Sequence, residues 1–412
     1  MMLKNTRFTY MKKYLLIILL NIFLINISST FSQSPSKLSA NAEISLLTCS
    51  PGGEIYSLFG HSAIRVKDPV SRIDLVFNYG IFDFETPNFV MKFVRGKLLY
   101  KLGVERFRRF QYQYVQENRQ VIEQVFNLDA LQKQKVYDFL TNNALPENAE
   151  YKYDFFFDNC ASRIDDVLRA SLGEEFTYDI PKREYLSFRN QLDYYIDGSY
   201  PKSPWADFGM DLILGIPADQ TADFKGEMFL PDLLSNNFTF GKLNNKTPLV
   251  KASKIIIPRK KPASIANWTV TPLLLFWVLC GITALFFLRK NNTFTKIFDF
   301  VLFLLLGLSG ALFIFMWVAT DHSVCHQNLN MLWMNPFHLL LAVNILRNNL
   351  NGFWKKYLWA TLIINGLIII FWKLLPQEFH WASFPIILMI SMRVVALLKQ
   401  DDILTVKRRL SK

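Results

Sequence analysis

Apolar residues form long runs only near the two ends of this chain. Residues 1–33 begin with several basic residues, continue into LLIILLNIFLI and become polar at SSTFSQSPS. This order is typical of a secretory signal peptide, whose apolar run is shorter than the ~20 residues of a membrane-spanning helix. We expect cleavage near residues 31–33, and an uncleaved anchor would export the following residues equally.

The second apolar region, residues 270–400, divides into five segments. They are Val270–Leu288, Ile297–Thr320, Met331–Leu346, Leu358–Leu375 and Phe384–Leu398. The third is short and opens at Asn335-Pro336, so its boundary is the least defined of the five. We predict a bundle of about five transmembrane helices, followed by a basic cytoplasmic tail at residues 401–412.

Basic residues mark one side of this predicted bundle. If the first segment runs outside to inside, the loops that contain Arg289 and Arg347 and the tail that contains Lys407 are cytoplasmic, whereas DHSVCHQNLN and PQEFHWA lack lysine and arginine. By the positive-inside rule, the residues before the first segment are then exported. Much of the net charge of +12 follows from this topology, so it does not indicate nucleic-acid binding.

Residues 40–255 mix charged, aromatic and turn-forming residues, which predicts one exported domain of the α+β class joined to the bundle by a linker at residues 256–269. The segments IYSLFGHSAIRV and IDLVFNYG flank the turn KDPVSR and predict a β-hairpin. The segment DALQKQKVYDFLTNNAL predicts an amphipathic helix that stops at Pro146.

Cys160 lies in FFFDNCASRIDD, where Asn159 or Asp158 can cap a helix whose apolar positions from Ile164 onward share one face. A thiol in the first turn of that helix feels the positive end of the helix dipole, which lowers its pKa and favours the nucleophilic thiolate. The alternative is structural, because an exported domain permits a disulfide between Cys160 and Cys49.

A thiolate nucleophile needs a base, and His61 is the histidine that residues 40–255 offer. The predicted hairpin places polar side chains of its second strand beside His61. Asn78 is our choice for the residue that orients the imidazole, and Asp74 is the reserve. The predicted catalytic set is therefore Cys160, His61 and Asn78.

Other polar residues could contact lipid near this site. We assign His322, His326, His380 and Arg65 to the entrance for acyl chains or lipid headgroups. His322 and His326 have a spacing that binds zinc on a helix, but the sequence adds no matching ligands. We expect neither a metal nor a cofactor.

The segment Phe89–Tyr114 interleaves aromatic residues with lysine and arginine. Such a surface can lie on anionic headgroups with its aromatic rings at the interface. A solvated strand and helix with aromatic core residues would show the same pattern, so both interpretations stay open.

The order His61, Asn78, Cys160 resembles the circularly permuted papain-like proteins, among them the lecithin retinol acyltransferases. Longer motifs resemble the exported domain of the Lnb lipoprotein N-acyltransferases. These are SPGGEIYSLFGHSAIRV, NYGIFDFETPNFVMKFVRGKLLYKLGV, NALPENAEYKYDFFFDNCASRIDD and GEMFLPDLL. In that family a multi-helix membrane region follows the exported domain.

This resemblance implies transfer of a fatty acyl chain, through a Cys160 thioester, from a phospholipid to the α-amine of a diacylglyceryl-cysteine lipoprotein. His61 and Cys160 match the family's paired histidine and cysteine. The resemblance also implies a multi-pass protein of the bacterial inner membrane with a periplasmic N-terminal domain.

Two other functions remain open at this stage. The same cysteine and histidine could serve a membrane-anchored cell-wall peptidase or amidase. A non-enzymatic envelope receptor or assembly protein would instead use a Cys49–Cys160 bridge as a structural link. A count of free thiols separates that last case from both enzymes.

Overall fold

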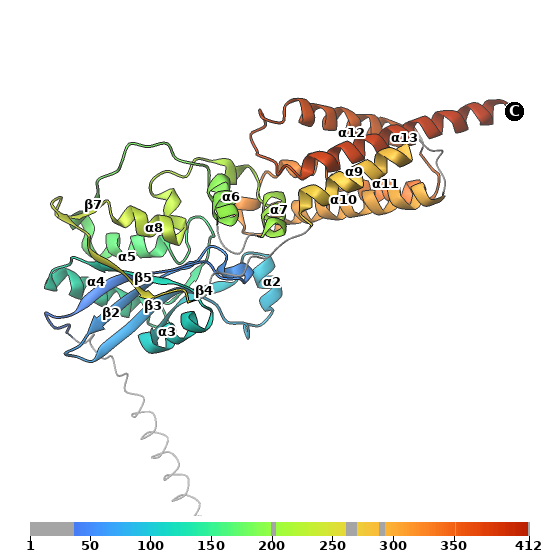
Figure 1. Cartoon of the computed structure of the whole chain (residues 1–412). Coiled ribbons are helices and arrows are strands. Elements are labelled where there is room, and N and C mark those ends of the chain that lie inside the picture. The colour runs from blue at the N-terminus through green and yellow to red at the C-terminus, as the bar shows by residue number, and fades with distance from the viewer. Residues whose placement is uncertain (1–36, 199–202, 261–269, 288–292, 351, 411–412) are drawn as a thin grey trace, which may run out of the picture. The chain divides into compact units, whose positions relative to one another are not determined.

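The computed structural model describes residues 37–198, 203–260, 270–287, 293–350 and 352–410 (Figure 1). The predicted signal peptide, residues 1–33, lies outside the described residues. All elements below belong to one compact unit, Leu38–Lys412.

A seven-stranded antiparallel sheet forms the centre of the N-terminal domain, in the order β10-β5-β1-β2-β3-β4-β6. Its strands are β1 (Glu43–Cys49), β2 (His61–Asp68), β3 (Ile73–Ile81), β4 (Leu99–Arg106), β5 (Val121–Phe126), β6 (Glu150–Lys152) and β10 (Val250–Ile257). The predicted hairpin is confirmed as β2 and β3, although β2 begins at His61 because residues 55–57 form a short 3-10 helix.

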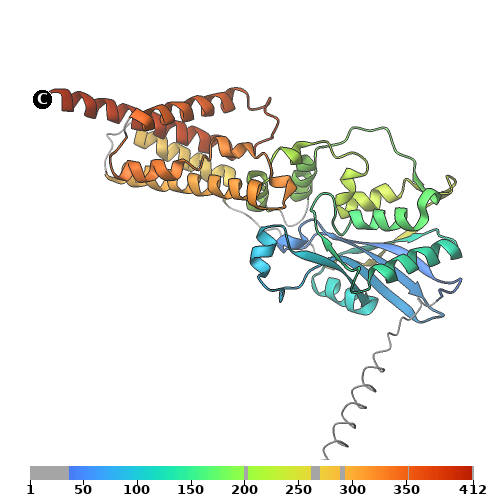
Figure 2. The same ribbon diagram turned by 180° about the vertical axis from the view of Figure 1, so that it is seen from behind.

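Helices cover both faces of this sheet, as Figures 1 and 2 show from opposite sides. The larger core lies beneath α4 (Ala130–Asn143), α5 (Ser162–Leu172) and α8 (Pro231–Phe238). The smaller core lies beneath α3 (Phe107–Gln116). Strand residues alternate between the two: Ile44 and Leu46 of β1 belong to the larger core, Leu47 and Cys49 to the smaller one.

The predicted helix before Pro146 is confirmed as α4. Asp129 accepts a hydrogen bond from the backbone of Gln132, and the Gln132 side chain accepts one from the backbone of Asp129. This capping box satisfies backbone donors that a helix start leaves unpaired. The helix thus begins where its sequence supplies the cap.

Smaller elements complete the domain. A second sheet contains β7 (Phe176–Tyr178), β8 (Gly241–Leu243) and β9 (Thr247–Pro248), and the remaining α-helices are α2 (Phe89–Val94), α6 (Phe188–Gly198) and α7 (Pro204–Ile213). Strand β10 continues to Ile257, and the Lys260 backbone donates to the side chain of Asn118. The domain therefore extends past the predicted boundary at residue 255, because its edge strand does.

Each predicted membrane segment contains a helix. They are α9 (Pro272–Phe287), α10 (Thr293–Ala319), α11 (His338–Leu346), α12 (Gly352–Ile370) and α13 (Ser383–Leu410). Among the described residues, α10 and α12 have the length and the apolar composition of membrane-spanning helices, and α9 is a shorter apolar helix. Five helices therefore occupy the region of the five predicted spans, and two of them are long and apolar enough to cross a membrane by themselves.

The third predicted span is wrong in extent. Residues 329–332 form a 3-10 helix, and α11 begins only at His338. Pro336 lacks the backbone donor that a continuous helix needs, and Asn335 accepts a hydrogen bond from the backbone of Phe337. Gly310 of α10 lies against this break, since a Cβ there would come within 1.8 Å of the Met334 carbonyl oxygen.

A buried ion pair joins two helices of the C-terminal domain. Arg393 of α13 donates to both carboxylate oxygens of Asp299 in α10, at 2.5 and 2.8 Å. Both side chains are almost fully buried. An unpaired charge in this apolar surrounding costs several kcal/mol of desolvation free energy, roughly the usual amount for a buried ion. Each of the two residues therefore compensates the charge of the other.

Candidate active site

Cys160 lies immediately before helix α5. Asn159 caps that helix, because its side-chain oxygen accepts from the backbone of Ala161 at 2.8 Å and of Ser162 at 3.0 Å. Asp158, the other predicted cap, pairs with Arg163. The assigned helix begins at Ser162, and the backbone of Arg163 already donates to the Asn159 carbonyl oxygen at 3.1 Å, so the thiol lies at the start of the helix.

The same asparagine anchors the cysteine loop to the rest of the domain. Its side-chain nitrogen donates to the carbonyl oxygens of Phe155 at 2.8 Å and Phe229 at 2.9 Å. Asn159 is buried, so these bonds are shielded from water. One side chain therefore holds both the helix start and the loop that presents the thiol.

His61 is the first residue of β2, where its backbone pairs with Cys49 of β1. The preceding Gly60 has a φ of +78°, and a Cβ at this position would lie 2.5 Å from the Cys49 carbonyl oxygen. Side chains rarely adopt that conformation, and the space for one is filled. Glycine is thus required for the chain to enter β2 with His61 at its first position.

The structure brings Asn78, not Asp74, to the imidazole. The Nε2 atom of His61 and the side-chain oxygen of Asn78 form a hydrogen bond. Asp74 instead accepts two hydrogen bonds from Arg65, at 2.8 and 2.9 Å. Of the two predicted orienting residues, only Asn78 has the required contact.

Cys160 lies beside the ends of β2 and β3. The pairing of these strands covers Ile64–Asp68 and Ile73–Phe77, so their other ends are open to a third segment. A Cβ at Gly80 would be 3.5 Å from the Cβ of Cys160. The backbone amides of Ser62 and of Cys160 itself act on the sulfur to lower the pKa of the thiol. The thiol therefore lies where the ends of both strands meet the start of α5.

The electrostatics of the site favour a thiolate and an imidazolium. Burial opposes a charge on Cys160, but the attraction and hydrogen bond of His61, with the two backbone donors, lower the pKa of Cys160. Burial also opposes a charge on His61, but the attraction of Cys160 and its hydrogen bond, with that of Asn78, raise the pKa of His61. Both shifts act in the direction of a thiolate beside an imidazolium, the charged form in which a cysteine is a nucleophile.

The alternative of a Cys49–Cys160 disulfide is wrong in this structure. Both cysteines are free. Cys49 faces the core beneath α3, whereas Cys160 packs against the core on the opposite face of the sheet. Burial raises the pKa of Cys49 to about 12, so this thiol is not a competing nucleophile.

Arg65 does not lie at an entrance, which corrects the prediction. Its side chain is buried, pairs with Asp74 and Glu123, and stacks on Phe107 with 3.5 Å between the guanidinium carbon and the ring centre. The residue shares the strand face of His61 but lies deep under α3. It therefore links sheet and helix.

His322 and His380 contact different parts of the protein, and His326 does not share a helix with His322. The ring of His322 bonds the Phe93 carbonyl oxygen at 3.2 Å, and His380 lies 3.4 Å from Asp207. His326 follows the short 3-10 helix Ser323–Cys325, so the helical spacing required for zinc does not arise. No group of three potential metal ligands occurs in the described part of the chain.

Sequence reasoning missed several groups around the thiol. The donor amide of Ser62 and the glycines Gly60 and Gly80, both with positive φ, carry no side-chain chemistry. Tyr153 lies at the same place, since its ring is 3.7 Å from a Cβ built on Gly80. In the sequence, the glycines of FGHS and NYGI were the features that could have indicated the backbone turns beside the site.

The fold and the site together define an α+β protein in which a cysteine, histidine and asparagine set belongs to a domain joined to a helical membrane domain. Comparison with family models gives the particular family. The model of the Lnb N-terminal periplasmic domain matches residues 36–185, and that of the Lnb transmembrane domain matches residues 264–402. The chain therefore belongs to the Lnb family and is a membrane protein with a periplasmic domain. No curated protein and no solved structure matches it.

Proposed function

We propose that this protein is a thiol-dependent lipoprotein N-acyltransferase of the bacterial inner membrane. The observation that supports this most is the Cys160, His61 and Asn78 arrangement within the periplasmic domain of an Lnb family member. The acyl donor is a phospholipid, and the acceptor is the free α-amine of a diacylglyceryl-cysteine lipoprotein. No metal or nucleotide is needed.

The first half-reaction forms an acyl enzyme. The thiolate of Cys160 attacks the ester carbonyl carbon of the phospholipid, which forms a carbon–sulfur bond and breaks the carbon–oxygen ester bond. The imidazolium of His61 gives its proton to the departing oxygen. The products are a thioester on Cys160, neutral His61 and a lysophospholipid.

The second half-reaction transfers the chain to the lipoprotein. The α-amine attacks the thioester carbonyl, which forms an amide bond and breaks the carbon–sulfur bond. His61 takes the proton of the attacking amine, so the thiolate and imidazolium return. Because thioesters react readily with amines, this N-acylation requires no further activation.

The tetrahedral intermediates need donors for their oxyanion. At the start of α5, Asn159 already occupies the backbone N–H groups of Ala161 and Ser162. The backbone amides of Cys160 and Ser62 lower the pKa of the Cys160 thiol. We assign the oxyanion to these two amides, because groups that favour a negative charge on the sulfur can also favour one on an oxygen of the acyl carbon bound to it.

Mass spectrometry of lipoprotein N-termini tests this function directly. Cells that lack the protein are complemented with wild type, Cys160→Ala, His61→Ala or Cys49→Ala. We expect the N-linked acyl chain with wild type and Cys49→Ala, and not with the other two variants. Cys49 is the control because it is a free cysteine of the same domain whose raised pKa keeps it a neutral thiol. Equal N-acylation in all strains would reject the proposal.

The order of product release tests the mechanism separately. With a phospholipid donor alone, the purified protein is expected to release one equivalent of lysophospholipid and to retain an acyl thioester sensitive to hydroxylamine. Release that strictly requires the lipoprotein would argue against the two-step scheme. Altered cell-wall fragments with unchanged lipoproteins would instead indicate the peptidase or amidase alternative.

A further inference from the structure

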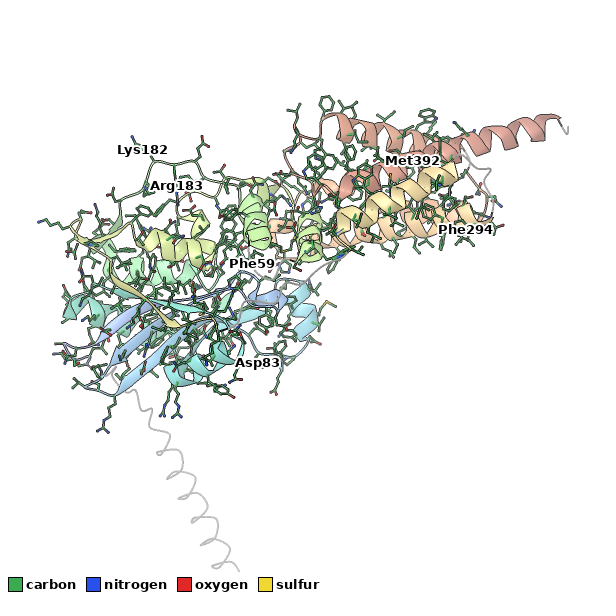
Figure 3. All side chains as sticks on the ribbon, in the orientation of Figure 1. Phe59, Asp83, Lys182, Arg183, Phe294 and Met392 are labelled. Carbon is green, nitrogen blue, oxygen red and sulfur yellow. The ribbon has the colours of Figure 1, made fainter. Side chains whose placement is uncertain are left out.

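An exposed apolar patch surrounds α2. It consists of Phe84 in the preceding loop and Val90, Met91 and Phe93 on the helix, whose exposed fractions are 72, 71, 58 and 50%. No residue of α2 is buried. Asp83, labelled in Figure 3, marks the loop beside this α2 patch. Large side chains gathered at this exposure usually mark a binding surface.

The patch is held at the end of a membrane-spanning helix. The carbonyl oxygen of Arg95 accepts a hydrogen bond from the backbone of Asp321 at 2.9 Å, and that of Phe93 bonds the ring of His322. Asp321 also pairs with Lys152 at 3.2 Å. Because α10 ends at Ala319, these contacts hold the α2 patch where α10 leaves the apolar part of the membrane.

The surface of α10 next to this junction is itself apolar and exposed. Val318 is 75% exposed and Trp317 is 40% exposed. Tryptophan is enriched where helices leave the hydrocarbon core of a bilayer. These exposed apolar side chains come just before Asp321, which contacts Arg95 at the end of α2.

A row of aromatic rings leads from the α2 patch to the thiol. Phe89 of α2 contacts Phe82, with 5.9 Å between ring centres, and Phe82 contacts Tyr100 at 5.3 Å. Tyr100 stacks on Tyr153 at 4.4 Å. Tyr153 borders the position of Cys160 next to Gly80. Apolar side chains thus connect the exposed patch with the reactive sulfur.

Basic residues border the same segment. Lys92 is partly exposed, and Arg95 and Lys97 are exposed. Lysine and arginine beside apolar side chains that enter a bilayer can bind lipid phosphates while their neighbours enter the acyl region. This arrangement matches a lipid surface in both its apolar and its charged parts.

We propose that the α2 patch inserts into the periplasmic leaflet of the membrane, and that lipid acyl chains are its partner. The α3 part of Phe89–Tyr114 does not share this role, because Phe110 and Tyr114 are buried in the protein core. If the proposed acyl transfer also holds, the aromatic row is the path by which a lipid ester reaches Cys160. Insertion itself does not depend on that function.

Depth-dependent fluorescence quenching tests the insertion. The full chain with Cys160→Ala carries an environment-sensitive label on Val90→Cys or, as a matched control, on Val70→Cys. Val70 is also an exposed valine, at 64%, in the turn after β2. The turn and the open end of the hairpin near His61 are separated by the 8 residues of β2. At the usual rise per strand residue this is roughly 25 Å. The remaining native cysteines are buried, which protects them from the label. Mass spectrometry verifies that the introduced cysteine carries the label.

The labelled proteins are reconstituted in phosphatidylethanolamine and phosphatidylglycerol vesicles that contain acyl-chain spin labels. We expect a blue-shifted emission and strong quenching for the label at position 90, and water-like emission with little quenching at position 70. Equal quenching at both positions would overturn the proposal. Phe84→Cys provides a second position in the α2 patch if the first variant does not fold.

Charge substitution tests the path to the thiol. We expect Val90→Glu to lower the rate of Cys160 acylation from vesicle phospholipid roughly tenfold, because a carboxylate resists burial at the membrane interface. Val70→Glu is expected to leave that rate unchanged. Alkylation of Cys160 by iodoacetamide is expected to be equal in both, which shows an intact site. Unchanged acylation in Val90→Glu would overturn the path, and absent acylation in the wild type would reject the acyltransferase function while leaving the quenching result intact.

Discussion

The hydrogen bond between Asn78 and His61 gives the sharpest test of the site. Replacement of Asn78 by alanine removes the acceptor of the imidazole Nε2–H and leaves the strand backbone paired with Gly103. A hydrogen bond to a charged group contributes about 1.5 to 3 kcal/mol, which corresponds to a roughly 10- to 100-fold loss in the rate of Cys160 acylation. We expect a loss in this range without a large loss of folding stability.

The pH dependence of acylation distinguishes this role from a merely structural one. Activity requires the thiolate, which appears as pH rises through the lowered pKa of Cys160, and the imidazolium, which disappears as pH rises through the raised pKa of His61. Because Asn78 contributes to raising the pKa of His61, Asn78→Ala should move the upper limb of the profile to lower pH. Asn78→Asp adds a negative charge and should move it to higher pH.

The assay is lysophospholipid release from a phospholipid donor between acidic and alkaline pH, with circular dichroism to verify folding. Asp74→Ala serves as the control, since Asp74 contacts Arg65 rather than His61 and Arg65 keeps Glu123 as a partner. Its upper limb should stay in place. An Asn78→Ala protein within twofold of wild type, with an unmoved upper limb, would refute the assignment.

Three further substitutions have definite expected outcomes. Gly60→Ala should destabilise the domain by about 1 to 3 kcal/mol and abolish acylation, because its φ is positive and the Cys49 carbonyl oxygen fills the space for a Cβ; denaturant unfolding measures this, and wild-type stability would contradict it. Asn159→Ala should lower the free energy of unfolding by about 1 to 3 kcal/mol and slow alkylation of the thiol, because the cap and two buried hydrogen bonds disappear. Asn159→Asp keeps the capping oxygens and should recover part of the stability and part of the alkylation rate. Arg393→Leu should destabilise the helical domain by about 3 to 5 kcal/mol through an unpaired Asp299, while Arg393→Leu with Asp299→Leu should be milder; thermal unfolding in detergent compares the two, and equal losses would argue against the ion pair as the cause.

The sequence alone determined the order and type of the parts. A run of apolar residues and the side on which lysine and arginine fall are local properties, so the helix-containing segments and the exported domain could be predicted without a fold. The capped helix α4 and the β2–β3 hairpin were predictable for the same reason, because caps, turns and periodicity lie within a few residues of one another. The residue types of the site were also evident, since few side chains combine a nucleophile with a base.

Only the tertiary structure decided which of these residues meet. Asn78 and Asp74 lie on the same strand, and the register of β2 against β3 gives Asp74 to Arg65 and leaves Asn78 for His61. The alternation of side chains in β1 turns Cys49 into the core beneath α3, and both Cys49 and Cys160 are free, so the bridge that the sequence allowed is not formed. Such contacts depend on strand register and on which face of a sheet a distant segment covers, and neither is encoded within one short stretch of sequence. For the same reason, the anchoring of α2 to the end of α10 and the break before α11 appeared only in the folded chain.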